Sequence, residues 1–293
     1  MIRQCVTPLL MMFAASGAAN AAERLEATYD FLWNGIRVST AEARADLMAD
    51  RYDLSIGFRM RGLAKLFSNG RSVVTAKGAY GGEYNVIPVS YDSSGRWDGE
   101  DYSRSLTFTP EGSLLSLEQD WPEKWQEDFP REDVPAELKR GPDPASIAVA
   151  LMTAEISAIT TGDVISIPVF DGETVIEWQM QCSAEAVELE NSSHSDFAGP
   201  AHECMLGTKL VAGKRILTEK EKKKLEKGRA KREKKKNKGK EEDHRPRFWV
   251  MADEQTGYLL PVRAEMESGM GRVMMYLKEL QVTDLDADSI AAR

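Results

Sequence analysis

The chain has 293 residues and a formal net charge of −9, and its length allows one large or two small domains. The charge is unevenly distributed. Residues 214–247 contain 17 Lys and Arg against 7 Asp and Glu, so this segment has a net charge of +10 and the remainder of the chain −19. The composition therefore excludes a chain that is basic throughout and indicates an acidic body that carries one basic arm.

The first 21 residues have the pattern of a secretory signal peptide. Arg3 supplies a positive charge, residues 6–15 are apolar apart from Thr7, and Ala19-Asn20-Ala21 is the small-x-small pattern that signal peptidase cleaves. The apolar run is shorter than the roughly 20 residues that span a bilayer. We therefore expect a cleaved signal and a secreted protein, with an uncleaved anchor as the alternative.

Residues 22–120 have the pattern of consecutive short strands. Apolar side chains fall at every second position from Leu25 to Trp33, the period of a strand with one buried face. Asn34-Gly35 follows, a pair typical of two-residue hairpin turns. Turn-forming residues separate the later strands, and 121–135 is expected to be an acidic, aromatic loop. The predicted strands are 25–33, 36–47, 52–60, 72–79, 86–91, 103–109 and 114–119.

The pattern changes at residues 141–159, which predict one central helix. Asp143 is a suitable N-cap, and Pro144 fits the first helical position because its missing N–H has no partner there. The run that follows is apolar almost all round, so the helix needs cover on most of its faces. The fold class expected is mainly β: a curved antiparallel sheet, a β-spiral or open barrel, wrapped around this helix.

Strands resume after the helix and are interrupted once by the basic arm. The arm, 214–247, contains few helix-breaking residues and no apolar face, so we expect a solvated helix or a disordered excursion. The predicted strands are 164–170, 175–180, 186–189, 204–211, 248–252, 260–266 and 272–282. The predicted domains are a signal peptide 1–21, one β-rich domain made of 22–213 and 248–282, the basic insertion 214–247, and a flexible tail 283–293.

Two cysteines remain after signal cleavage, Cys182 and Cys204, each beside a predicted strand. An even pair in an oxidising compartment predicts a structural disulfide. One alternative is two free thiols; the other is a metal site, because His194 and His202 lie between the two cysteines. These spacings match no zinc pattern, which usually has close pairs such as C-x-x-C, so we expect no metal.

Catalytic motifs are not found in the sequence. It contains three histidines and no G-x-S-x-G, H-E-x-x-H or P-loop, so we expect no catalytic residue and no cofactor. The basic arm has no interleaved aromatic residues, and secretion removes it from the cytoplasm, so nucleic acid is not expected. Anionic lipid head groups, lipopolysaccharide phosphates or an acidic protein are the expected partners of the arm. The alternative is a solubilising insertion that binds nothing specific.

Five motifs recur in one family: Tyr29-x-Phe31-x-Trp33-x-Gly35-Ile36, Pro88-x-x-Tyr91, the run 141–146, Cys204 followed by Gly213, and Leu260-Pro261-Val262-Arg263. Together they resemble the DUF3108 family (domain of unknown function), secreted proteins of Gram-negative bacteria. The resemblance covers residues 23 to about 282, and its motifs are structural. It implies a role in the periplasm or envelope and an outline similar to periplasmic β-spiral envelope-integrity proteins and to lipoprotein carriers of the LolA/LolB type. The basic arm departs from the family pattern as an insertion into a hairpin.

The expected function is non-enzymatic. We expect a periplasmic binding or scaffold protein for an apolar ligand, such as a lipid or lipoprotein, or for an envelope protein. The hypothetical ligand groove beside the central helix is lined by Phe31, Phe58, Met266 and Met274, and Met suits such a surface because its chain adapts to irregular shapes. The alternatives are an envelope hydrolase with an unidentified carboxylate site, and a structural module whose own side chains fill the concavity.

Overall fold

The computed structural model describes residues 22–62, 65, 69–128, 130–236, 245–268 and 271–285. The predicted signal peptide, and the predicted tail after residue 285, lie outside these residues. Within them, no helix is both long and apolar enough to cross a membrane. The strands are β1 (Glu23–Trp33), β2 (Ile36–Leu47), β3 (Arg51–Met60), β4 (Gly70–Ala79), β5 (Ile87–Trp97), β6 (Glu100–Phe108), β7 (Leu114–Asp120), β8 (Val164–Phe170), β9 (Val175–Leu189), β10 (Gly199–Ala212), β11 (Arg247–Ala252), β12 (Leu259–Ser268) and β13 (Gly271–Asp284). The helical segments are α1 (Glu123–Asp128), η2 (Ala136–Leu138), α2 (Pro144–Met152), α3 (Ile156–Ile159) and α4 (Glu219–Lys236).

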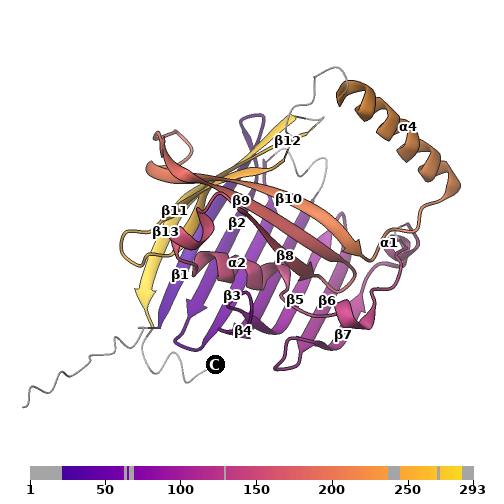
Figure 1. Cartoon of the computed structure of the whole chain (residues 1–293), viewed down its shortest axis with the longest axis horizontal. Coiled ribbons are helices and arrows are strands. Elements are labelled where there is room, and N and C mark those ends of the chain that lie inside the picture. Colours follow the sequence, from indigo (N-terminus) through magenta and orange to yellow (C-terminus); the bar gives the residue numbers. More distant parts are fainter. Residues whose placement is uncertain are drawn as a thin grey trace, which may run out of the picture.

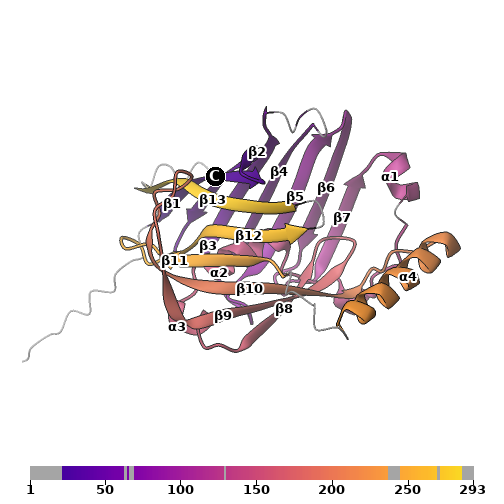
Figure 2. The ribbon, with the colours of Figure 1, turned by 90° about the horizontal axis from the view of Figure 1, so that it is seen from above.

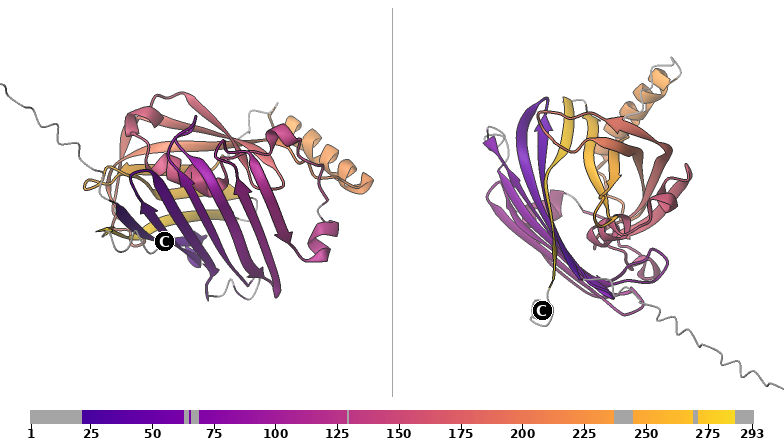
Figure 3. Two further views of the ribbon diagram at one scale, coloured as in Figure 1. Left: turned by 90° about the horizontal axis from the view of Figure 1, so that it is seen from below. Right: turned by 90° about the vertical axis from the view of Figure 1, so that its left-hand side faces the viewer.

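The strands form one antiparallel sheet in the order β7-β6-β5-β4-β3-β2-β1-β13-β12-β11-β10-β9-β8. The first and last strands of the chain, β1 and β13, are neighbours in the middle of this order, so both ends of the chain contribute to one sheet. The sheet curves strongly (Figure 1; Figure 3, right) without closing, since among the described strands β7 and β8 remain edges. The expected fold class, mainly β with an open, curved sheet, is confirmed.

Helix α2 lies in the concavity, between β3–β5 on one side and β8 and β12 on the other (Figures 1 and 2). Residues of the sheet that pack against it include Tyr52, Leu54 and Ala76, all buried. We call the face of the sheet that carries these side chains the inner face. Successive residues of a strand alternate between faces, so the inner face of β3 continues through Ile56 to Phe58.

The start of α2 follows the sequence signals. The Oδ1 atom of Asp143 accepts hydrogen bonds of 2.9 Å from the backbone N–H groups of Ala145 and Ser146, and Pro144 occupies the first helical position. The helix buries Ala145, Ile147 and Val149, which agrees with its apolar sequence. A helix covered on several sides is therefore confirmed.

The helix is shorter than predicted. Instead of continuing to Ile159, α2 ends at Met152, and the separate turn α3 begins at Ile156. Thr153 is the C-cap residue of α2, with φ −94° and ψ 2°, and Glu155 has an extended backbone. The break redirects the chain, so that Ile159 packs in a cluster with Met180 and the two cysteines.

Other elements differ from the sequence prediction in extent. The strands predicted at 175–180 and 186–189 are one long strand, β9, whose pairing with β10 is irregular between His202 and Cys204. The loop predicted at 121–135 contains the short helix α1, in which the Trp125 N–H donates to the carbonyl of Pro122 (2.8 Å).

The basic arm does not interrupt a simple hairpin. Strand β11 starts opposite Met205, since Met205 pairs with Arg247, whereas β10 continues to Ala212. Seven residues of strand correspond to about 23 Å, so the two ends of the arm are far apart on the body. The expectation of an insertion into an ordinary hairpin is wrong in this respect.

Candidate functional site

The inner face has two regions, because α2 covers only one end of the strands. The hydroxyl of Tyr52, near the start of β3, donates a hydrogen bond of 2.7 Å to Ser146 of α2, and both residues are fully buried. Phe58 lies six residues further along β3, about 20 Å away. It is only half-buried and belongs to none of the buried clusters formed by the described residues.

Aromatic rings follow one another across this second region. Phe58 contacts Phe31 of β1 edge to face, with ring centroids 5.9 Å apart, and stacks on Trp97 of β5 at 6.5 Å with an interplanar angle of 17°. These geometries are favourable for aromatic pairs. The three rings come from alternate strands, so they bridge β2 and β4, whose inner-face residues here are small.

The small residue under Trp97 is Gly70. The register pairs the two residues across β4 and β5, and a Cβ atom at Gly70 would lie 2.1 Å from the Trp97 ring. Gly95 has the same relation to Tyr102 of β6, whose hydroxyl would lie 2.9 Å from a Cβ atom there. Glycine therefore allows the rings to lie directly on the backbone of the neighbouring strand.

The rings continue onto the segment that follows the sheet edge. Tyr102 contacts Trp125 of α1 (5.7 Å), and Trp125 contacts Trp121 edge to face (6.1 Å). We call the six residues the aromatic row; its members are Phe31, Phe58, Trp97, Tyr102, Trp125 and Trp121. All six are partly exposed, and they include three of the six tryptophans of the chain.

A pocket of about 290 Å³ lies at the Trp121 end of the row, lined among others by Leu117, Trp121, Trp125 and Val134. The Trp121 Nε1–H group is buried and has no acceptor among the described residues. Buried indole N–H groups usually have a partner, but this one is inaccessible to a molecule in the pocket. We call this place the corner pocket.

A buried arginine supports the corner. Arg104 of β6 has its guanidinium 4.5 Å from the centre of the Trp121 ring, a cation–π geometry. It donates to the carbonyl of Asp171 (2.6 Å) and lies 2.8 Å from a carboxylate oxygen of Glu173 in the β8–β9 turn. Through these contacts Arg104 connects β6, near one edge of the sheet, to the turn next to the other edge.

Of the four predicted groove residues, the structure brings together two. Phe31 and Phe58 touch, as described. Met266 is 44% exposed on β12, opposite Val273. Met274 lies opposite Leu32, whereas Phe31 lies opposite Met275, so the register places Met274 on the other face of the sheet. A single groove containing all four is therefore wrong.

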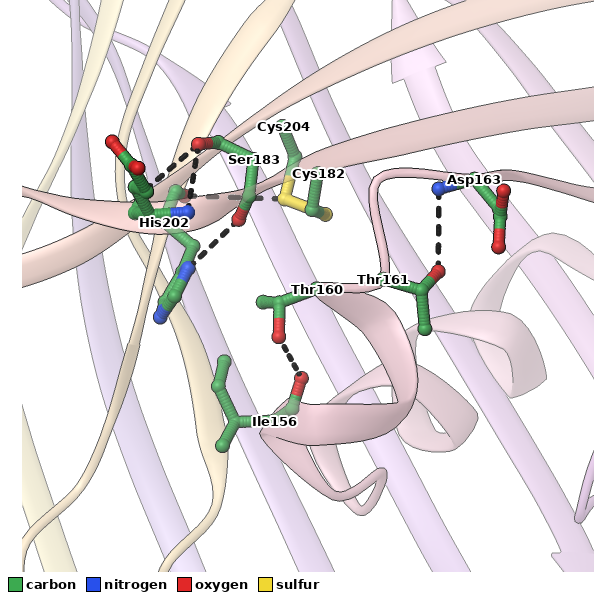
Figure 4. The surroundings of a disulfide bond; sticks show 9 residues. Ile156, Thr160, Thr161, Asp163, Cys182, Ser183, His202 and Cys204 are labelled. Carbon is green, nitrogen blue, oxygen red and sulfur yellow. Dashed lines mark hydrogen bonds between the residues drawn. A yellow bond between two sulfur atoms is a disulfide. The ribbon is translucent and has the colours of Figure 1, made fainter.

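The predicted disulfide between Cys182 and Cys204 is present and joins β9 to β10 (Figure 4). The histidines considered as metal ligands are elsewhere engaged: a ring nitrogen of His202 lies 2.9 Å from the Ser183 carbonyl oxygen, and the His194 ring contacts Tyr276 at 5.4 Å. The described residues contain no group of three or more His, Cys, Asp or Glu arranged to hold a metal ion.

One hydrogen-bonded set of residues bears on the hydrolase alternative, because it places a serine hydroxyl next to a carboxylate. Tyr52 donates to Ser146, whose hydroxyl in turn donates to Asp143, and burial raises the pKa of Asp143. Each of the three is at most 1% exposed. Because a substrate cannot reach the Ser146 hydroxyl, this chain of hydrogen bonds fixes the start of α2 and is not a catalytic site.

Sequence reasoning missed four members of the row: Trp97, Tyr102, Trp121 and Trp125. The signal for Trp97 was available in principle, since Tyr91, Ser93, Gly95 and Trp97 alternate on one face of β5. Tyr102 follows from the hairpin register. The two tryptophans beyond β7 depend on how α1 folds back, which no periodicity predicts.

Comparisons with known proteins give a family and a distant fold relative. A family model described as "Protein of unknown function (DUF3108)" matches residues 28–278. No curated protein matches the chain. A solved β-barrel-like protein of the domain of unknown function DUF1849 from Brucella abortus is 8% identical, with a TM-score of 0.45 over 91% of this chain and 100% of that one. Since both descriptions concern unknown functions, the function must be inferred from the geometry.

Proposed function

The chain belongs to the DUF3108 family, whose function is unknown, and we propose that it is a non-enzymatic binding protein of the periplasm that holds an acyl chain of a lipid along the aromatic row. The observation that carries this proposal is that the row is left partly exposed, whereas inner-face residues nearer α2, such as Tyr52, Leu54 and Ala76, are buried in the core. Large aromatic side chains gathered on one exposed strip are typical of binding surfaces.

The dimensions of the row support an elongated apolar ligand. It extends from β1 to β6 and onto α1, and five strand spacings correspond to about 24 Å. The row consists of two groups of contacting rings, Phe31–Phe58–Trp97 and Tyr102–Trp125–Trp121, and this elongated arrangement suits an extended acyl chain better than a compact ligand. At the far end, the corner pocket, lined by Trp121 and Trp125 among others, offers space for an oxygen-bearing head of the lipid.

A binding role without catalysis is supported by the chemistry near the row. The described side chains closest to it in the corner are Arg104, Arg131 and Glu173, which pair with one another. The serine hydroxyl that donates to Asp143, that of Ser146, is sealed in the core. These features favour retention of a ligand over its chemical conversion.

A periplasmic location is part of the proposal. The signal-peptide pattern of residues 1–21 motivates it, and a disulfide between the two remaining cysteines suits an oxidising compartment.

Uptake of a fluorescent fatty acid by the purified mature chain tests this function. Phe58→Asp places a charge in the middle of the row and should reduce affinity by at least about tenfold, because burying a carboxylate beside an acyl chain is costly. Leu115→Asp is the matched control, since Leu115 lies outside the row on the edge strand β7 and is 70% exposed. Equal loss in both variants, or no uptake by the wild type, would leave the structural-module alternative.

A further inference from the structure

The basic arm forms a helix that stands apart from the sheet. Figures 1 and 2 show α4 beyond the β7–α1 end of the body. Its 18 residues include 11 Lys and Arg and 4 Glu, a net charge of +7. Residues 219–228 are solvent-exposed apart from Glu221, and Leu225 is 49% exposed. The helix therefore contributes little to the core and presents mainly charge.

The arm is nevertheless held in place at its base. The Glu132 N–H donates to the Lys214 carbonyl (2.8 Å), the Ile216 N–H donates to the Pro130 carbonyl (2.7 Å), and Arg131 donates to the Gly213 carbonyl (3.0 Å). These bonds attach the arm to the segment that follows α1. The arm thus leaves the body at the corner where the aromatic row ends.

The start of α4 is fixed as well. Thr218 and Glu221 form a capping box: the Thr218 N–H donates to Glu221 (2.9 Å), and the Glu221 N–H faces the Thr218 hydroxyl (3.4 Å). Arg215 also donates to Glu221 (2.8 Å), and these donors hold the pKa of its carboxyl below the usual range. The backbone contacts at the base of the arm and the capping box at Thr218 together determine where α4 begins relative to the body.

The charge pattern selects the kind of partner. Cationic residues occur all round α4, including Lys220, Lys222, Lys223, Lys224 and Lys227, and they share no apolar face. A helix of this kind does not fill a hydrophobic groove of a protein or insert into acyl chains. It has no aromatic residues for stacking on bases. A layer of phosphate groups matches a diffuse cationic helix of about 27 Å.

We propose that α4 binds the anionic surface of a phospholipid bilayer and thereby holds the corner of the body at that surface. The rest of the chain has a net charge of −16, so the body is repelled where the arm is attracted. This difference orients the molecule with the arm toward the lipid. The binding requires only charge on α4 and is independent of whether the aromatic row is occupied.

Co-sedimentation of the mature chain with vesicles tests the proposal. Vesicles of equal parts phosphatidylglycerol and phosphatidylcholine should bind it at low salt, vesicles of phosphatidylcholine alone should not, and about 0.5 M salt should abolish binding. Replacing Lys220, Lys223, Lys224 and Lys227 by Gln should weaken binding at least about tenfold. The matched control replaces Arg51, Lys65, Lys77 and Lys209 of the body by Gln and changes the net charge equally.

The outcomes separate the alternatives. Loss of vesicle binding in the variant with four arm lysines replaced, together with near-wild-type binding of the body control, supports the proposal. Equal loss in both variants would show that only net charge matters, and no binding of the wild type to anionic vesicles would mean that the arm is a solubilising insertion. Binding of polyglutamate or single-stranded DNA as tightly as of vesicles, at the same salt, would assign the arm to polyanions generally. Each of these three results overturns the membrane assignment, and none depends on fatty-acid uptake.

Discussion

Trp97 lies directly on the backbone of Gly70. The two residues are paired across β4 and β5, and the space in which Gly70 would carry a Cβ atom is filled by the indole ring. Phe58 stacks on the same ring, so the position of Trp97 determines whether this contact within the aromatic row is made. The contact between a glycine and a tryptophan is thus a structural requirement of the proposed site.

Gly70→Ala should displace the Trp97 ring and destabilise the protein by about 1–3 kcal/mol, the usual cost of overpacking. Fatty-acid uptake should fall with it. Gly57→Ala in β3 is the matched control, since the nearest atom to its Cβ, the Glu42 carbonyl oxygen, would be 3.9 Å away. Urea unfolding monitored by tryptophan fluorescence measures both variants. Identical stability of the two would show that Trp97 does not occupy this space.

Arg104→Ala should lower the free energy of unfolding by about 3 kcal/mol. The substitution leaves the partly buried Glu173 without its nearest cation and removes the cation–π contact with Trp121. The exposed pair Arg96–Asp101 on the neighbouring β5–β6 hairpin provides the control. Arg96→Ala should leave the unfolding midpoint unchanged, since exposed ion pairs contribute little. A similar loss in both variants would contradict the bridging role of Arg104 between β6 and the β8–β9 turn.

Asp143 should give the stability an identifiable pH dependence. Burial raises its pKa in the folded state, so between the ordinary value of about 4 and the raised value the folded protein binds more protons than the unfolded one. Stability associated with this group should therefore fall as the pH rises through that window. Asp143→Asn should remove this dependence at a cost of about 1 kcal/mol, because the amide oxygen still caps α2.

Asp143→Ala provides the comparison and should cost about 2–3 kcal/mol, since the N–H groups of Ala145 and Ser146 lose their acceptor in a buried position. Chemical unfolding at several pH values measures all three proteins. If the Asn variant kept the pH dependence of the wild type in the acidic range, another group would be responsible.

The arm should be removable only with a spanning linker. Replacing residues 217–244 by a Gly/Ser linker of roughly twelve residues preserves the base contacts of the arm and covers the distance of about 23 Å between its ends. The melting temperature should stay within a few degrees of the wild type. Joining Gly213 to Phe248 through a short turn should lower it strongly, because β10 and β11 are offset by seven residues. Unfolding of the linker variant would mean that α4 belongs to the core.

The sequence predicts the fold class well because periodicity is a local property. Alternation from Leu25 to Trp33 and the Asn34-Gly35 turn correspond to β1 and the β1–β2 hairpin, and Asp143-Pro144 marks the start of α2. The end of α2 was not predictable in this way. The helix ends at Thr153, and beyond the break Ile159 packs in a cluster with the two cysteines, a long-range contact that no local pattern records.

The candidate site was predictable only in part. Phe31 and Phe58 share the inner face because two-residue alternation places them there. Met274 does not lie on the inner face. The face that it occupies depends on the pairing of β1 with β13, and these strands are some 240 residues apart in the chain. Trp121 and Trp125 join the row through contacts made by α1 after the chain leaves the sheet. Long-range pairing of this kind leaves no periodic signal in the sequence.

The most direct measurement of the central claim is native mass spectrometry of the protein recovered from the periplasm of its host, followed by lipid analysis of the released species. The account predicts a population carrying one lipid per chain, which is absent from Phe58→Asp and retained by Leu115→Asp. Recovery of wild-type protein at its bare mass, with no acyl species released on denaturation, would contradict the assignment of the aromatic row as a lipid site.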